Sequence, residues 1–273
     1  MSAIMGSDEP EPQGRSTPAT LAPEPLPAAG SAELAAMGAS WVWTKACVIV
    51  AALVAGVLAW GIGERTYGYF GPSAKALQSS REFLALNREQ RAADQKNTAI
   101  AFGTFGAVLG LVFGSAGGGL RRSIPAGATA ALMGLLLGGI GGALISYGLT
   151  PIFGRFYSDE SPSLLLTILV RGGIWAAVGM TAGLALGWGW QGSRGIAGTL
   201  IGGLAGGFFG TIAFEVVNAL IFPGERNDAV IPSSMQARLL AYLFVTLGAA
   251  MGAVLFGHHR SLPASRSLQT NHS

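Results

Sequence analysis

Residues 198–210 read GTLIGGLAGGFFG, an uncharged and apolar stretch in which six of thirteen residues are glycine. Glycine costs about 1 kcal/mol relative to alanine in a water-exposed helix. In lipid, a segment that is not helical leaves backbone amides unpaired, so a glycine-rich segment stays helical there. Glycines spaced four apart share one face, and a neighbouring backbone can approach closely along it. The stretch therefore predicts a membrane helix that packs tightly against others.

The composition of the whole chain also indicates a membrane protein. Its 273 residues are 50% hydrophobic and only 11% charged, whereas a soluble domain carries about 25% charged residues. The net charge is +3, but the bases lie mostly in short gaps between apolar runs, and no basic tract with interleaved aromatics predicts nucleic-acid binding. Cys47 is the single cysteine, which excludes an intrachain disulfide. His258 and His259 are adjacent, so they chelate poorly together, and we interpret them as interfacial residues; no metal or cofactor is predicted.

Six apolar runs predict an all-α membrane protein with six transmembrane helices, because each run is close to the roughly 20 residues that cross a bilayer. The predicted spans are residues 41–62, 98–119, 124–150, 164–188, 195–222 and 238–257. The resulting organisation is a disordered N-terminal head (1–40), a first transmembrane helix (41–62), a polar segment (63–97), a five-helix glycine-rich bundle (98–257) and a short tail (258–273).

The two polar regions are interpreted from their composition. Residues 1–40 hold six prolines and five acids with one base, which predicts disorder. Because this head is acidic and the apolar run begins only near Trp41, the first span is expected to be an uncleaved anchor and not a secretory signal. Residues 73–94 contain good helix formers, and we expect a helix on the membrane surface or against the bundle, either plainly solvated or bound to a partner.

The distribution of bases predicts an orientation in a bacterial inner membrane. The short gaps with Arg121, Arg122 and Arg194, and the tail after the last span, contain no acid, so we place them and both termini in the cytoplasm. Segment 64–97 disagrees, because it carries six bases and four acids on the opposite side. The three arginines are interpreted as orientation signals or as groups that hold anionic lipid headgroups.

The bundle also contains an internal repeat. Gly114 and Gly187 are each followed seven residues later by an arginine, Arg121 or Arg194, and then by another glycine-rich run. We expect a parallel helix-pair repeat with glycine-zipper packing, in which the offset Gly203 lets one helix pack two neighbours. The predicted helix-packing residues are Gly106, Gly110, Gly114, Gly134, Gly138, Gly142, Gly179, Gly183, Gly187, Gly198, Gly202, Gly206, Gly210, Gly248 and Gly252.

Part of the bundle resembles a known module. Residues 171–217 read RGGIWAAVGMTAGLALGWGWQGSRGIAGTLIGGLAGGFFGTIAFEVV, and residues 238–257 read RLLAYLFVTLGAAMGAVLFG. The plan of arginine, apolar helix, basic turn, GGLxGGxxG helix, loop, arginine and apolar helix resembles a glycine-rich bacterial multi-pass membrane module of largely unknown function. In that family the module is often joined to forkhead-associated (phosphothreonine-binding) or other signalling domains. This chain departs from the family pattern in showing no recognisable appended domain.

Two charges lie within the apolar runs. Arg171 is about two turns into the fourth span, and Glu215 is about two turns from the end of the fifth, both measured from the same side. Charges in hydrocarbon usually face a partner or a cavity. Three interpretations follow: an Arg171–Glu215 ion pair, a snorkelling Arg171 with a protonated or water-facing Glu215, and a proton or ion pathway through Glu215. Asn218, one turn beyond Glu215, is expected in the same polar cluster.

Catalysis has little support in the sequence. No histidine and only one acid fall within a span, and the glycine-rich GSAGGGLRRS at 114–123 lacks the GK[ST] ending of a phosphate loop. A lipid-modifying enzyme would need a catalytic cluster that the sequence does not reveal. We therefore predict a non-catalytic structural or interaction component whose partners are the lipid bilayer and further copies in a homo-oligomer. The alternative is a small transporter or channel that uses Glu215 and Arg171 in a polar path between repeats.

Overall fold

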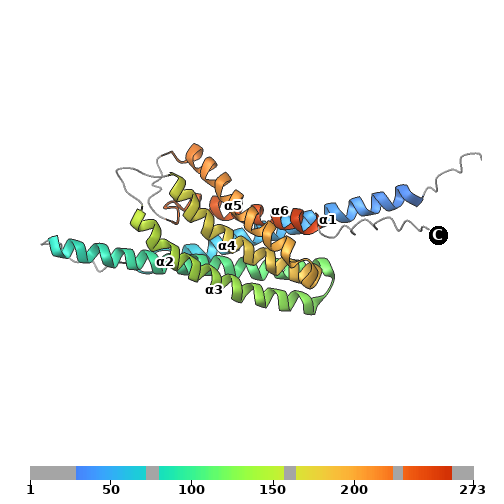
Figure 1. Cartoon of the computed structure of the whole chain (residues 1–273), viewed down its shortest axis with the longest axis horizontal. Helices are drawn as coiled ribbons and strands as arrows, with labels where there is room; N and C mark the ends of the chain where they lie inside the picture. The colour runs from blue at the N-terminus through green and yellow to red at the C-terminus, as the bar shows by residue number, and fades with distance from the viewer. Residues whose placement is uncertain (1–28, 72–79, 157–163, 224–229, 260–273) are drawn as a thin grey trace, which may run out of the picture. The chain divides into compact units, whose positions relative to one another are not determined.

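The computed structural model describes residues 29–71, 80–156, 164–223 and 230–259. Its elements are α1 (Ala29–Thr66), α2 (Ser80–Arg121), α3 (Ile124–Phe156), α4 (Leu164–Gln191), a 3-10 turn η1 (Gly192–Arg194), α5 (Ile196–Ile221) and α6 (Met235–His259) (Figure 1). The described residues contain six helices long and apolar enough to span a membrane and no strand. The predicted fold class, an all-helical multi-pass membrane protein, is confirmed. The chain divides into residues 1–40 and 41–273, and the packing below concerns the second unit.

Two boundaries differ from the sequence prediction. The helix α1 begins at Ala29, inside the segment predicted as a disordered head, whereas residues 1–28 lie outside the described part. Alanines are frequent in residues 29–40, and alanine is the best helix former. Only prolines stop a helix firmly, and the last proline of the head is Pro27.

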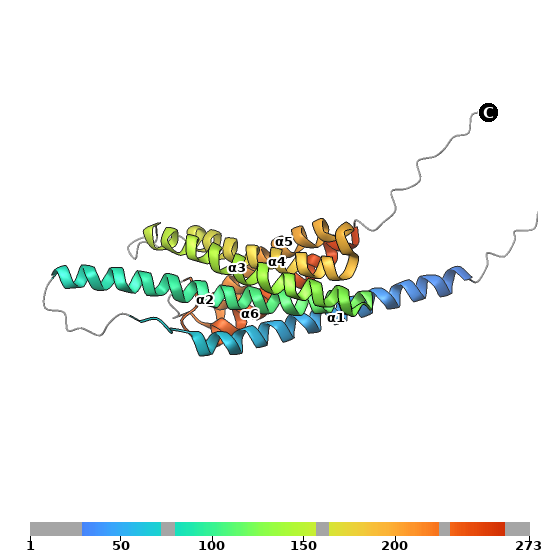
Figure 2. The ribbon, with the colours of Figure 1, turned by 90° about the horizontal axis from the view of Figure 1, so that it is seen from below.

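The polar segment before the second span also differs. Residues 80–97 are not a separate surface helix; they form the first turns of α2, which runs unbroken to Arg121. No glycine or proline occurs between Ser80 and Gly103, so nothing in the sequence interrupts the helix. Both views show these first turns extending past the ends of α3 and α4 (Figures 1 and 2). Residues 73–79 of the predicted surface helix lie outside the described part.

A tight turn joins α2 to α3 at one end of the bundle. Arg122 adopts a left-handed conformation with φ of 55°, and the Ser123 amide donates a hydrogen bond of 3.0 Å to the Gly118 carbonyl. This closes the last turn of α2 in the manner of a helix C-cap. The turn sends α3 back along α2 in antiparallel contact.

Glycines bring the backbones of α2 and α3 together. A Cβ atom added to Gly106 would overlap the carbonyl of Gly138, and one added to Gly110 would overlap the carbonyl of Gly134. Along the same interface Gly114 meets the backbone at Ala130, and Gly142 meets the carbonyl of Phe102.

The helix α5 has two glycine faces. Gly202 and Gly206 lie against the backbone of α6, where added Cβ atoms would overlap the carbonyls of Gly252 and Gly248. Gly203, on the other face, lies against the backbone of Gly179 in α4. Along these two interfaces Gly198 and Gly210 meet the carbonyls of Phe256 and Phe244 in α6, and Gly183 and Gly187 meet Thr199 of α5. One helix thus packs two neighbours through different glycines.

The most buried of the six helices is α4, which contacts α2, α3, α5 and α6. Four aromatic rings fill the space where α2, α4 and α6 meet. Trp175 of α4 lies edge-on to Phe102 and Phe105 of α2, with ring centroids 4.7 and 5.1 Å apart, and Tyr242 of α6 lies 4.6 Å from Phe105. All four side chains are buried. The bundle interior at this level is a packed aromatic core.

Candidate functional site

An ion pair between α4 and α5 is the most deeply buried charged contact among the described residues. Arg171 Nη1 lies 2.6 Å from Glu215 Oε1, and the side chains are 1% and 12% exposed. This is the first of the three arrangements that the sequence left open. Removing either partner alone would leave a buried charge without a counterion.

The register of the glycine contacts explains why these two residues meet. In the antiparallel pair of α4 and α5, Gly183 lies against Gly203 and the Thr199 carbonyl, and Gly207 against the Trp175 carbonyl. One further turn along both helices brings residue 171 opposite residue 211, and Glu215 follows on the next turn of α5. The long arginine side chain spans that remaining turn. The same register that packs the glycines therefore positions the ion pair.

Asn218 lies one turn beyond Glu215 on α5. Its side chain is 2% exposed, and its Oδ1 atom has no hydrogen-bond partner among the described residues. Its backbone carbonyl accepts a 2.8 Å bond from the Phe222 amide at the end of α5. A buried acceptor without a donor is unfavourable, so Asn218 marks the point in this cluster where a further donor would be stabilised.

The second ion pair, which the sequence analysis missed, joins α6 to α1. Arg238 Nε lies 2.6 Å from Glu64 Oε1, and Nη2 lies 2.7 Å from Oε2. Nη1 donates to the carbonyls of Pro232 and Ser233 at 3.1 and 2.7 Å. The guanidinium carbon also lies 3.7 Å from the ring centroid of Tyr67. Arginine suits this geometry because its rigid fork matches a carboxylate at two points.

A sequence signal for this second pair did exist. Glu64 follows the first span directly, and Arg238 opens the sixth, so an antiparallel arrangement of the two spans places them at one end of the bundle.

The three arginines predicted at the membrane surface, Arg121, Arg122 and Arg194, are all exposed. They lie at the two helix connections, α2–α3 and α4–α5. Exposed guanidinium groups at that end fit either role considered for them, orientation or headgroup contact, and both remain predictions.

Comparisons with protein-family models, with curated proteins and with solved structures found no match to this chain. The resemblance to glycine-rich bacterial membrane modules therefore remains a prediction that depends on the sequence pattern alone.

Proposed function

We propose that this multi-pass membrane protein is a non-catalytic structural or interaction component of the bacterial inner membrane. The observation that carries the proposal is the direct Arg171–Glu215 contact at 2.6 Å, with Arg171 only 1% exposed. The charges are used to join two helices. A path for a substrate or ion needs charges that face an open route, and this pair faces itself.

The aromatic core supports the same conclusion. Phe102, Phe105, Trp175 and Tyr242 are packed against one another in the bundle interior, where a channel would need open space. Glycines bring the backbones of α2 and α3, and of α5 and α6, into close contact. Such tightly packed interfaces leave little free volume into which the helices could move, so the bundle should resist deformation. Such a rigid body suits a scaffold that holds partners or copies of itself.

The decisive experiment removes one charge. In Glu215→Gln the Arg171 guanidinium loses its counterion, so we expect a loss of about 3–5 kcal/mol in the free energy of unfolding, measured as resistance to denaturant in neutral detergent. The charge-reversed double variant Arg171→Glu/Glu215→Arg should recover part of that loss, because the pair is restored in the opposite sense. Proton flux into vesicles, followed with a pH-sensitive dye, should be at background for all variants and for the wild type.

The transporter alternative is favoured by one observation, the unpartnered Oδ1 of buried Asn218 beside Glu215. If Glu215 carried protons, Glu215→Gln would fold with unchanged stability and would abolish a flux that the wild type shows. That pair of results would overturn the scaffold proposal and favour transport.

The proposed orientation, with both termini in the cytoplasm, is tested separately by labelling. With Cys47 replaced by serine, a single cysteine at Ser193, which is exposed in η1, should be protected in intact cells from an impermeant maleimide. A single cysteine at exposed Gln90 in α2 should be labelled. The reverse result would show the opposite orientation.

A further inference from the structure

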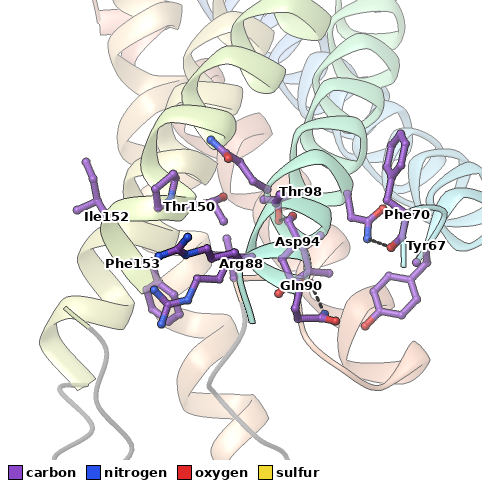
Figure 3. A pocket seen from close by; sticks show the side chains of 17 residues that line it. Tyr67, Phe70, Arg88, Gln90, Asp94, Thr98, Thr150, Ile152 and Phe153 are labelled. Carbon is purple, nitrogen blue, oxygen red and sulfur yellow. Dashed lines mark hydrogen bonds between the residues drawn. The ribbon is translucent and has the colours of Figure 1, made fainter. Parts of the chain in front are cut away.

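A cavity of about 810 Å³ opens at the end of the bundle where α1 ends and α6 begins. Its walls are residues 67–70 after α1, the first half of α2, the last turns of α3 and residues 230–231 before α6 (Figure 3). Small-molecule sites have volumes of about 300–1,000 Å³. This volume is therefore large enough for a ligand, and neither the ion pairs nor the aromatic core line it.

One face of α2 carries a gradient of polarity into the cavity. Arg88, Arg91, Gln95 and Thr98 all line it, at the three- and four-residue spacing that keeps them on one helix face. Arg88 and Arg91 are exposed, Gln95 is half-buried and Thr98 is 4% exposed. Over about 15 Å of helix, the lining changes from two guanidinium groups to a buried hydroxyl.

The opposite wall and the floor are mainly apolar. Ile152 and Phe153 come from α3, and Val230 and Ile231 from the segment before α6. Phe153 and Val230 are buried, at 3% and 4% exposed. Figure 3 shows Arg88 reaching from α2 toward Phe153 of α3, so the cationic rim and the apolar floor face a common space.

Two hydrogen-bonded contacts hold the walls in place. Pro151 lines the cavity within α3 and has no N–H to donate to the carbonyl four residues earlier. That carbonyl, of Tyr147, instead accepts a 2.8 Å bond from Gln95 Nε2 of α2. On the other side, the Asn97 side chain pairs with the backbone of Phe70 through bonds of 2.9 and 2.8 Å. These bonds join α2 to α3 on one side of the cavity and to Phe70 on the other.

We propose that this cavity binds an anionic membrane lipid, with its phosphate on Arg88 and Arg91 and the start of an acyl chain on the Phe153–Val230 floor. Planar guanidinium groups bind phosphate oxygens at two points. Asp94 also lines the cavity and accepts a 2.9 Å bond from Gln90. Because the two arginines outnumber this one acid, the lining keeps a net positive charge. Tyr67 and Phe70 flank the rim, as aromatic residues do at a membrane interface.

The combination of groups favours a lipid over a water-soluble anion. Inorganic phosphate would occupy only the cationic rim, whereas the apolar lining below the rim suits an acyl chain. The cavity also lies where the charged first turns of α2 pass into its apolar residues, the part of a membrane helix that is expected beside lipid headgroups. The site does not depend on whether the bundle is a scaffold or a transporter.

The test measures binding of a fluorescent short-chain phosphatidylglycerol to the full chain in neutral detergent. Arg88→Gln/Arg91→Gln should weaken binding by about tenfold or more. The control Lys45→Gln/Arg65→Gln removes two exposed charges that do not line the cavity and should change the Kd by less than about twofold. Equal weakening in both double variants, or none in the first, would show that the lipid binds elsewhere.

A second variant tests whether the lipid occupies the cavity, without removing a charge. Ala92 is exposed and lines the cavity, so Ala92→Trp fills space without removing a charge, and Ala92→Ser serves as its control. We expect weaker lipid binding in the tryptophan variant only, with unchanged thermal stability in both.

Competitors then identify the source of the anion. Unlabelled phosphatidylglycerol should displace the probe, whereas phosphatidylcholine and millimolar inorganic phosphate should not. Displacement by inorganic phosphate as efficient as that by the lipid, with Ala92→Trp binding as the wild type does, would replace the lipid assignment with a simple anion site.

Discussion

The helix α6 is held by α5 and by α1 in opposite ways. Toward α5 it presents Gly248 and Gly252, whose backbones touch those of Gly206 and Gly202. Toward α1 the contact is made by side chains. Arg238 forms an ion pair with Glu64, and the indole of Trp60 donates a hydrogen bond of 3.3 Å to the carbonyl of Met235. Even Gly56 of α1 faces side chains, since an added Cβ would lie 3.0 Å from Thr246 Oγ1 and 3.1 Å from Leu243 Cδ2.

The difference shows two solutions to helix association in lipid, where no hydrophobic driving force exists between helices. The α5–α6 interface gains many weak van der Waals contacts along a groove, and the α1–α6 interface gains a few strong polar ones at one end. A groove tolerates no added volume, because its neighbours are backbone atoms that cannot rotate away. A side-chain interface tolerates volume but depends on individual charged groups.

The largest expected effect comes from filling the groove. Gly202→Leu/Gly206→Leu should lower the free energy of unfolding by about 5 kcal/mol or more, because two side chains would overlap backbone carbonyls and α5 and α6 would have to separate. Denaturation in neutral detergent measures the loss.

The matched control is Gly148→Leu, since Gly148 of α3 has nothing within 4 Å of an added Cβ. It should stay within about 0.5 kcal/mol of the wild type. A double variant as stable as this control would show that the α5–α6 groove contributes nothing to packing.

A smaller effect is expected at the other face of α6. Arg238→Gln removes both bonds to Glu64 and the contact with Tyr67, and should cost about 1–3 kcal/mol, because Glu64 is partly exposed and regains water. Loosening of α1 from α6 should expose Cys47, the only cysteine, which is partly buried in α1. Its alkylation by a maleimide should accelerate in Arg238→Gln.

This variant also sharpens the contrast between the two interfaces. Arg238→Lys keeps the charge but loses the two-point geometry, and it should fall between the wild type and Arg238→Gln in both measurements. Unchanged Cys47 reactivity in all three proteins would mean that α1 is held by its apolar contacts alone.

The smallest effect concerns a side chain that completes a backbone interaction. Gln95→Leu leaves the Tyr147 carbonyl without the donor that Pro151 cannot supply, and should cost about 1 kcal/mol. Pro151→Ala restores the missing N–H, so Gln95→Leu/Pro151→Ala should be more stable than Gln95→Leu. If the proline replacement gives the same gain with and without Gln95, the two residues are not coupled.

The sequence predicted those parts of the molecule that depend on local composition. Six apolar runs led to six helices, and the four-residue glycine spacing gave faces whose members, such as Gly206 and Gly248, do lie in contact. The depth of Arg171 and Glu215 measured from one side gave the pair between α4 and α5. Each inference needed only helical periodicity and the cost of charge in lipid.

The features that sequence analysis missed depend on contacts between distant segments. Arg238 and Glu64 are 174 positions apart, and the cavity combines four separate stretches of chain. Neither arrangement follows until it is known that α1 packs against α6. The boundary expected before the second span was wrong for a different reason: the polarity of this segment indicated a separate helix, whereas its uninterrupted helix formers continue into α2. The internal repeat stays a prediction.

The unbroken course of α2 has a mechanical consequence. Its 42 residues form a rod of about 63 Å, whereas a bilayer with its headgroups is about 40–45 Å thick. Even an upright α2 therefore exceeds the bilayer by roughly 20 Å, shared between its two ends, so its first turns extend from the headgroup layer into water. A push or pull on that protruding stem travels without a joint to the opposite side of the membrane, where Gly118 abuts Gly127 of α3. A partner bound to the first turns of α2 could therefore shift the whole α2–α3 hairpin.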